Sequence, residues 1–136
     1  MIYWHPSCKA QLQELKRRTG LPVYAVCSGL SRVYADKKLF DVGVEEFLWL
    51  VDHAEYVVTS SFHGAAMSTI FGKKFAAVVN PGAPSRLRNL LQTLDIPEVP
   101  IRELDCAGDF DYTVIRTRMA EERARGLQYL KEAVEK

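Results

Sequence analysis

Short runs of apolar residues alternate along this chain with longer stretches in which apolar residues recur at helical spacing. The runs at 21–28, 55–60 and 73–80 have the length of strands. Because they are apolar almost throughout instead of at every second position, they are typical of strands buried on both faces of a sheet. Strands that alternate with helices indicate an α/β fold, here a Rossmann-like three-layer domain with a parallel sheet.

Five helices are predicted between and after these strands. Residues 2–4 are apolar but too few to predict a strand, and the polar stretch 29–43 is predicted to be a loop. The first helix has Ser7 as its cap, Gly20 as its stop and Ala10, Leu12 and Leu15 facing inward. The ranges predicted for the five helices are 8–19, 44–54, 62–71, 85–95 and 112–134.

Length and composition restrict the range of functions. A chain of 136 residues with 48% hydrophobic and 26% charged residues is the size of one globular domain. The net charge of +1 gives no argument for nucleic acid or for an anionic membrane. Three widely spaced cysteines favour a reducing compartment over a disulfide framework. We therefore expect a cytoplasmic protein, free or peripheral to the inner face of the membrane, with no nucleic acid among its partners.

The segment "TSSFHG", residues 59–64, is the candidate site. It falls where an apolar strand leads into a helix, and open parallel sheets bind ligands at that edge. The free N–H groups of a helix N-terminus suit phosphate or carboxylate. The hydroxyls of Ser60 and Ser61 can cap the helix or donate to an anion, and Gly64 removes a side chain that would block close approach. His63 can hold charge or deliver a proton near neutral pH.

A purely structural interpretation stays open beside this one. Serines before a helix often serve only as caps, and a single histidine is often structural. His53 at a helix end has a structural role by the same reasoning. His5 with Cys8 makes a poor metal site, so no metal is expected. The chain has no Gly-x-Ser-x-Gly elbow, no Gly-x-Gly-x-x-Gly sequence and no Walker sequence.

Two blocks in order, "EEFLWLVDHAEYVVTSSFHGAAMSTIFGKKFAAVVN" and "SRLRNLLQTLDI", resemble the polysaccharide pyruvyl transferase family over about residues 44–96. The resemblance implies transfer of the enolpyruvyl group of phosphoenolpyruvate to a sugar, which leaves a pyruvate ketal and phosphate. It implies His63 as a general acid, with no cofactor beyond phosphoenolpyruvate as co-substrate. The residues implied to bind the phosphate or carboxylate are Ser60, Ser61, Gly64, Arg86 and Arg88. An arginine on an exposed helix is also often no more than a solvated surface residue.

The same resemblance implies a larger assembly. Family members are similar to two-domain GT-B glycosyltransferases, with the active cleft between two Rossmann-like halves, and are commonly about twice this long. The chain is therefore expected to be a single domain, residues 1–136, that corresponds to the C-terminal half, without the N-terminal half. The implied partners are phosphoenolpyruvate, a glycan or lipid-linked sugar acceptor used in exopolysaccharide or cell-wall synthesis, and the missing N-terminal domain. Self-association through surface exposed by that absence is also expected.

Two other hypotheses remain open. The first is the C-terminal domain of a GT-B nucleotide-sugar glycosyltransferase, although no acidic residue is convincingly placed to hold a ribose. The second is a sensor or interaction module that has kept the fold. Binding of phosphoenolpyruvate against binding of a UDP-sugar separates pyruvyl transfer from glycosyl transfer.

Overall fold

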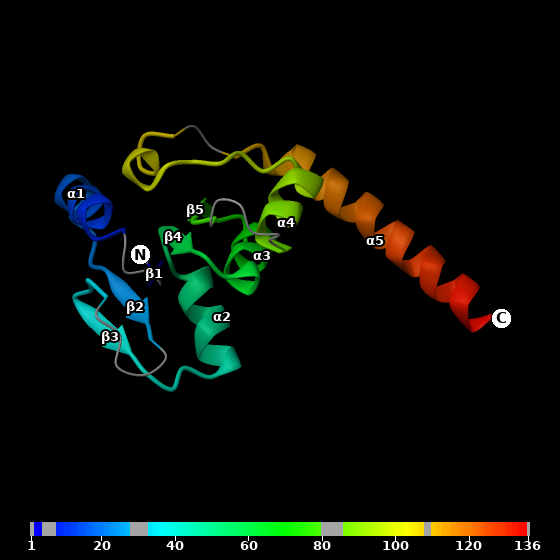
Figure 1. Ribbon diagram of the computed structural model, residues 1–136, viewed down its shortest axis with the longest axis horizontal. Helices are drawn as coiled ribbons and strands as arrows, with labels where there is room; N and C mark the ends of the chain where they lie inside the picture. The colour runs from blue at the N-terminus through cyan, green and yellow to red at the C-terminus, as the bar shows by residue number, and fades with distance from the viewer. Residues whose placement is uncertain (1, 4–7, 28–32, 80–85, 108–109, 136) are drawn as a thin grey trace.

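A parallel sheet of five strands forms the centre of the computed structural model, which describes residues 2–3, 8–27, 33–79, 86–107 and 110–135 (Figure 1). The spatial order of the strands is β3-β2-β1-β4-β5. β2 and β3 lie on one side of β1, and β4 and β5 lie on its other side. The direction in which the chain adds strands therefore reverses between β1 and β4. The strands are β1 (Ile2–Tyr3), β2 (Tyr24–Val26), β3 (Lys37–Leu39), β4 (Tyr56–Thr59) and β5 (Lys74–Ala77).

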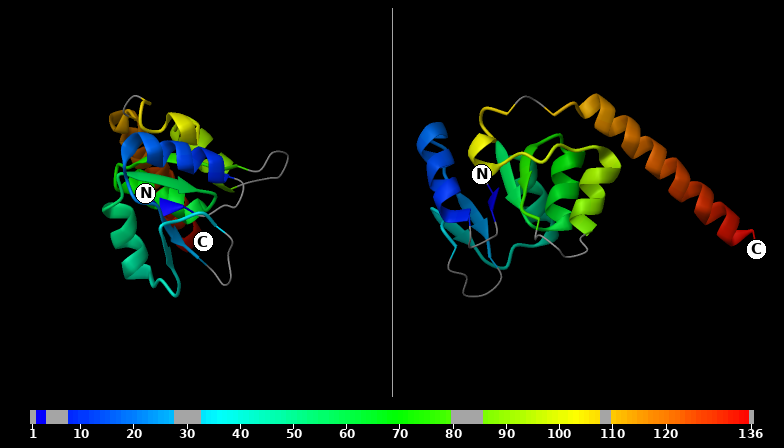
Figure 2. Two further views of the ribbon diagram at one scale, coloured as in Figure 1. Left: turned by 90° about the vertical axis from the view of Figure 1, so that its left-hand side faces the viewer. Right: turned by 45° about the horizontal axis from the view of Figure 1, so that its top comes forward.

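Helices cover both faces of this sheet, which gives the three layers (Figures 1 and 2). One face carries α1 and the short 3-10 helix η2, and the other carries α2, α3 and α4. The last helix, α5, packs by its first turns against α4. The helices are α1 (Lys9–Thr19), α2 (Val44–Asp52), α3 (Phe62–Ile70), α4 (Arg86–Leu94), η2 (Ile101–Glu103) and α5 (Tyr112–Val134).

Neighbouring residues of β4 and of β5 point into different cores. Val58 and Ala76 pack with α1 and η2, whereas Val57 and Phe75 pack with α2, α3 and α4. Val57 pairs with Phe75 and Val58 with Ala76 in the register of β4 and β5. Because both faces of the sheet are buried, the strands are apolar at consecutive positions.

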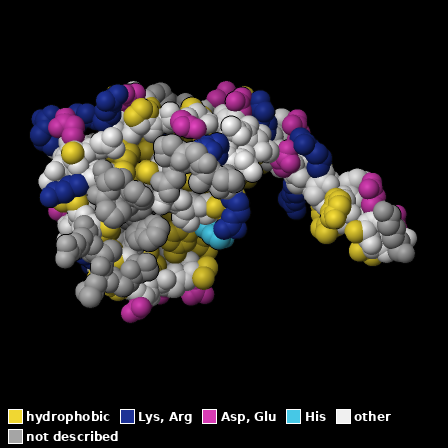
Figure 3. Space-filling model, in the orientation of Figure 1, with side chains coloured by type: hydrophobic (Ala, Val, Ile, Leu, Met, Phe, Trp, Pro, Cys, Tyr) yellow, Lys and Arg dark blue, Asp and Glu magenta, His cyan; other side chains and the backbone are white. Residues whose placement is uncertain are grey.

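The C-terminal helix extends away from the body of the domain (Figure 2, right). Ile115 is buried and Met119 is packed against the core, but Leu127, Leu130 and Val134 are exposed. The space-filling view shows hydrophobic side chains gathered near the far end of this helix (Figure 3). About half of α5 therefore has no packing partner among the described residues.

The α/β, Rossmann-like architecture with a parallel sheet is confirmed, and all five predicted helices form close to their expected bounds. The prediction of a loop at 29–43 was wrong in part, because β3 lies within it. Ile2–Tyr3 is a central strand, although the sequence run is short, because it pairs with β2 and β4 on its two sides. Ala10 is exposed, contrary to expectation, and the predicted cap Ser7 lies outside the described residues. Within the described ranges no helix combines the length and apolar character needed to cross a membrane.

Candidate functional site

The N-terminus of α3 lies where the strand order reverses. β4 ends at Thr59 and α3 begins at Phe62, so only Ser60 and Ser61 separate the strand from the helix. β4 is hydrogen-bonded to β1, and the reversal lies between these two strands. Ligands of doubly wound sheets bind outside the carboxyl ends of the strands at this point. The fold therefore places residues 59–64 at the position where this architecture binds ligands.

Hydrogen bonds from Thr59 and Ser61 fix the entry into α3. The Ser61 N–H donates to Thr59 Oγ1 at 3.0 Å, and Ser61 Oγ accepts from the Gly64 N–H at 3.5 Å. Ser61 has extended backbone angles and is the N-cap residue, as predicted for Ser60 or Ser61. The N–H groups at the start of α3 have no acceptor in a preceding turn, so they and the helix dipole are oriented toward the sheet edge.

Close packing explains why position 64 is a glycine, and the sequence did not indicate this. A Cβ placed on Gly64 would lie 2.3 Å from Thr59 Oγ1 and 3.0 Å from Thr59 Cβ. Gly64 is buried, so its Cα faces the end of β4 instead of solvent. The residue allows α3 to start directly against the strand, and this close contact holds the first turn of the helix at the ligand edge.

Aromatic contacts connect His63 to Arg86. The His63 side chain is exposed, and its ring meets Phe62 edge-on with 5.6 Å between centroids. The Arg86 guanidinium carbon lies 5.7 Å from the centroid of the same Phe62 ring, within the range of a cation–π contact. Phe62 therefore stands between an imidazole and a guanidinium that are 23 positions apart in sequence. A cavity of about 440 Å³ beside Phe62 and Arg86 extends between α4 and α5.

The other sequence-predicted residues are placed differently. Ser60 is half-buried and engaged in an interaction of its own, as is Arg88. Arg88 lies two positions beyond Arg86 on α4, where a side chain points to another face of the helix. The structure thus brings Ser61, His63 and Arg86 to one edge. Sequence reasoning missed Phe62 and Thr59; the only signal for Thr59 was a hydroxyl residue two positions before the cap.

The arrangement is suited to an anion. A helix N-terminus, hydroxyl groups, an arginine and an exposed imidazole lie together at one edge of the sheet. Among the described residues, no group of three or more His, Cys, Asp or Glu side chains could hold a metal ion. These side chains can bind an anion and transfer a proton.

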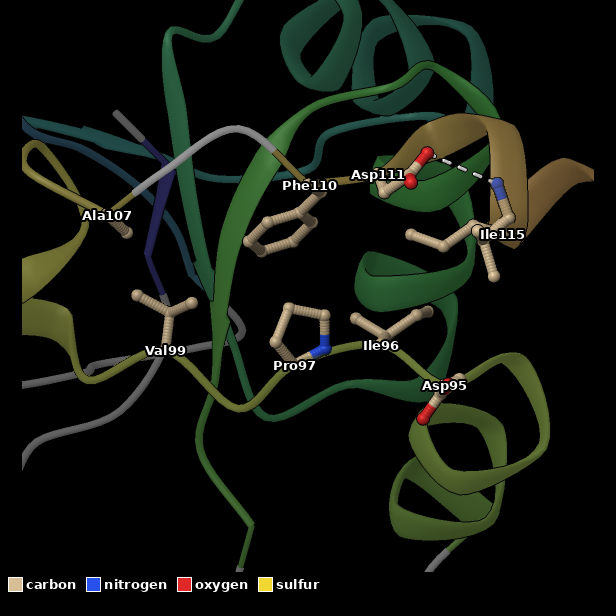
Figure 4. Close-up of a pocket in the computed structure, with 9 residues that line it drawn as sticks. Asp95, Ile96, Pro97, Val99, Ala107, Phe110, Asp111 and Ile115 are labelled. Carbon is tan, nitrogen blue, oxygen red and sulfur yellow. Dashed lines mark hydrogen bonds between the residues drawn. The ribbon is translucent and has the colours of Figure 1, made fainter.

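A second cavity, of about 500 Å³, lies at the opposite edge of the sheet (Figure 4). It is bounded by the residues that follow α4 and by the start of α5. Tyr112 places it at the amino ends of the strands, because its hydroxyl donates to the carbonyl of Lys73, just before β5. Its two carboxylates are in use: Asp95 pairs with Arg118 at 3.0 Å, and Asp111 caps α5. This cavity is lined mainly by Ile96, Pro97, Val99, Phe110, Val114 and Ile115.

The fold and the site define a Rossmann-like α/β domain with an anion-suited helix N-terminus at its switch point. In a comparison with known families, residues 16–81 match the family model for polysaccharide pyruvyl transferases. The match contains residues 59–64 and ends before α4, and it confirms the resemblance seen in the sequence. The comparisons with curated proteins and with solved structures return no match.

Proposed function

We propose that this domain binds phosphoenolpyruvate for transfer of its enolpyruvyl group to a sugar. The observation that carries the proposal is the position of the α3 N-terminus at the β1–β4 switch point, inside the segment that matches the pyruvyl transferase family. This donor needs a site that binds anions, since phosphoenolpyruvate carries a carboxylate and a phosphate.

Two groups on the domain suit the two anionic ends of the donor. The first-turn N–H groups of α3, with the Ser61 hydroxyl, can donate hydrogen bonds to one of them. The Arg86 guanidinium, held over Phe62, can pair bidentately with the other. Arg88 and Ser60 have interactions of their own and are proposed only as supports of this edge.

His63 is proposed as the proton donor of this reaction. In ketal formation one sugar hydroxyl oxygen bonds to C2 of the donor while a proton is added to its methylene carbon. A second hydroxyl of the same sugar then bonds to C2, the C2–O bond to phosphate breaks, and phosphate leaves. The two hydroxyl protons end on the methyl group and on the phosphate, so the reaction needs no oxidant or reductant. His63, exposed at the helix start, is proposed to deliver the proton to the methylene carbon.

The proposal also includes a second domain, by resemblance to GT-B enzymes. A cleft between two domains positions donor and acceptor, and positioning supplies several kcal/mol of a barrier, roughly 7–11 in favourable cases. We therefore expect the 136-residue chain by itself to bind the donor without pyruvylating any sugar.

Binding affinity tests the proposal. Calorimetry should detect phosphoenolpyruvate binding and no comparable binding of UDP-glucose. Arg86→Gln should weaken phosphoenolpyruvate binding by about tenfold or more, as expected for loss of a charged hydrogen-bonding partner. Arg125→Gln is the matched control, because this exposed arginine lies on the projecting part of α5. UDP-glucose binding in preference to phosphoenolpyruvate would instead support the glycosyltransferase hypothesis, and binding of neither would support a non-enzymatic module.

A further inference from the structure

A groove with an aromatic and acidic lining lies at the carboxyl end of β3. It has a volume of about 740 Å³ and is formed by the end of β3, the turn after it and the first turns of α2. In Figure 1 the arrowheads of β2 and β3 point toward this lower edge of the molecule. Because all five strands are parallel, the groove and the α3 N-terminus open on the same edge of the sheet. The lining residues used below are Lys38, Phe40, Asp41, Glu45, Glu46 and Trp49.

Trp49 is exposed yet fixed in orientation. Its side chain is 58% exposed, while its indole stacks on His53 with centroids 4.0 Å apart and planes 16° from parallel. His53 is fixed in turn, because its Nδ1–H donates to the Trp49 carbonyl at 2.9 Å. Phe40, 50% exposed, lines the same groove. The rings of Phe40 and Trp49 are thus both exposed to solvent, and the stacked His53 fixes the orientation of Trp49. An exposed apolar patch of this kind commonly marks a binding site.

The polar groups of the groove are mainly acidic. Asp41, Glu45 and Glu46 bring three carboxylates against the one ammonium of Lys38, so the lining carries a net charge of about −2. The Glu46 carboxylate turns back toward Gly43, where an added Cβ would lie 2.4 Å from its oxygen. In the space-filling view, acidic and hydrophobic side chains lie together along this lower edge (Figure 3).

From these observations we infer that the groove between Phe40 and Trp49 binds an uncharged sugar ring. A pyranose has an apolar C–H face that can lie on an aromatic ring and a rim of hydroxyls that donate to carboxylates, so its chemistry matches both parts of the lining. The net negative charge of the groove disfavours anionic sugars and phosphoenolpyruvate itself. The domain therefore has two sites with different charge preferences: the α3 N-terminus binds the anionic donor, and the groove at the β3 edge binds a neutral glycan.

The role of this bound sugar follows from the common edge. If the α3 N-terminus holds the donor, a glycan in the groove is the acceptor or a neighbouring unit of the acceptor chain; this part of the inference rests on the proposed function. Sugar binding in the groove does not rest on it. A second protein domain or a second copy of the chain is the alternative occupant. The three carboxylates in the lining disfavour it, because charged residues are depleted at the centre of protein interfaces.

Chemical-shift mapping with isotope-labelled protein separates these outcomes. The probes are neutral oligosaccharides (lactose, cellotriose and mannotriose) and one anionic sugar, galacturonic acid. At least one neutral probe should shift the amides of residues 38–50 in a saturable way, with millimolar affinity typical of a single shallow subsite. Galacturonic acid should bind more weakly than the best neutral probe.

Two variants and a control make the mapping decisive. Trp49→Ala should weaken the binding by about tenfold or more, and Glu45→Gln should weaken it to a smaller extent. Tyr129→Ala, which removes another exposed aromatic ring, in the far part of α5, should leave it unchanged. The inference is overturned if no neutral probe shifts residues 38–50, if Trp49→Ala binds as well as the parent, or if these shifts follow protein concentration instead of sugar.

The same samples keep the two proposals apart. Phosphoenolpyruvate should shift residues 59–65 and not the groove. Shifts at 59–65 without a sugar response at 38–50 contradict only this inference, whereas a sugar response without a phosphoenolpyruvate response contradicts only the proposed function.

Discussion

At the scale of single residues, position 64 couples the strand to the site. Gly64 is buried against Thr59, and any side chain there must displace the threonine. Gly126 in α5 makes a matched comparison, since a Cβ added there meets nothing within 4 Å. The two glycines are both helical, so their substitution by alanine differs mainly in the contact that the new methyl group makes.

Gly64→Ala and Gly126→Ala should therefore change stability in opposite directions. Gly126→Ala should stabilise the chain by roughly 0.5–1 kcal/mol, because alanine is the better helix former. Gly64→Ala should destabilise it by about 1–3 kcal/mol, as overpacking does. Adding Thr59→Ala, which removes the 2.3 Å contact, should recover part of that loss. Denaturant unfolding measures all four proteins, and equal effects of the two glycine substitutions would contradict this account of Gly64.

His63 should matter for chemistry and not for folding. The ring is exposed, so His63→Gln should leave the melting temperature close to that of the parent. In a protein that combines this chain with a second cleft-forming domain, the same change should lower turnover by about a hundredfold to ten-thousandfold while donor affinity changes less. A loss of about 1–3 kcal/mol of stability with turnover intact would mean that His63 is structural.

At the scale of elements, charged side chains of α1 connect it to its neighbours. Lys16 pairs with Asp36, just before β3, and Arg18 pairs with Asp105, just after η2. Asp36 also accepts from the Val23 N–H at 2.8 Å, before β2. The hydrogen bond from Lys16, together with that from Val23, lowers the pKa of Asp36, and the hydrogen bond from Arg18 lowers the pKa of Asp105. Asp36 thus connects the start of the polar edge strand β3 to α1 and to the residue before β2, in addition to the backbone hydrogen bonds that pair β3 with β2.

These carboxylates predict a sensitivity to acid. The pKa of Asp36 is lower in the folded chain than its ordinary value of 3.8, so its contribution to stability is present above pH 3.8. That contribution is lost as the pH falls through the lower folded-state pKa, because the unfolded chain binds the proton first. Asp36→Asn should reduce stability at neutral pH and flatten the decline below pH 3.8, with Glu55→Gln as an exposed control. Thermal unfolding as a function of pH measures both, and an unchanged acid decline in Asp36→Asn would contradict the assignment.

The strands with long apolar runs were predictable from sequence, whereas the exposed edge strand β3 and the two-residue central strand β1 were not. β2, β4 and β5 are buried on both faces, so each is an apolar run in the sequence, and these runs predict the strands. β3 lies at the edge of the sheet with Lys37 and Lys38 exposed, and charge on an edge strand protects it from pairing with other chains. That protective charge is what made the segment look like a loop.

The candidate site shows the same division. The cap at Ser61 and the position of His63 follow from local sequence, because a strand, a hydroxyl residue and a helix come in order. The approach of Arg86 to Phe62 depends on how α3 and α4 pack, and the groove at Trp49 depends on the path of the chain after β3. No short-range sequence pattern predicts the contact between Arg86 and Phe62 or the groove at Trp49.

At the scale of the whole molecule, the projecting half of α5 is the most unusual feature. Leu127, Leu130 and Val134 recur at helical spacing beyond Ile115 and Met119, which pack on the body. The apolar face that holds the helix to the domain thus continues into solvent (Figures 2 and 3).

We expect this chain to self-associate through that face, since exposed apolar surface drives association. Sedimentation at increasing concentration should detect a species larger than the monomer of 15.4 kDa. Leu130→Lys should shift the equilibrium toward monomer, whereas Arg116→Gln, near the root of the helix, should not. A monomer that persists at high concentration in the parent chain would count against this prediction.

Mapping of phosphoenolpyruvate on isotope-labelled protein tests the central claim, that the α3 N-terminus is the donor site. The account predicts saturable shifts centred on the amides of Phe62, His63 and Gly64, which weaken in Arg86→Gln and persist in Arg125→Gln. The shifts should fall at the carboxyl edge of β4 and leave the cavity at the opposite edge, near Phe110, unaffected. Shifts centred elsewhere, or the same shifts produced by UDP-glucose and not by phosphoenolpyruvate, would contradict it.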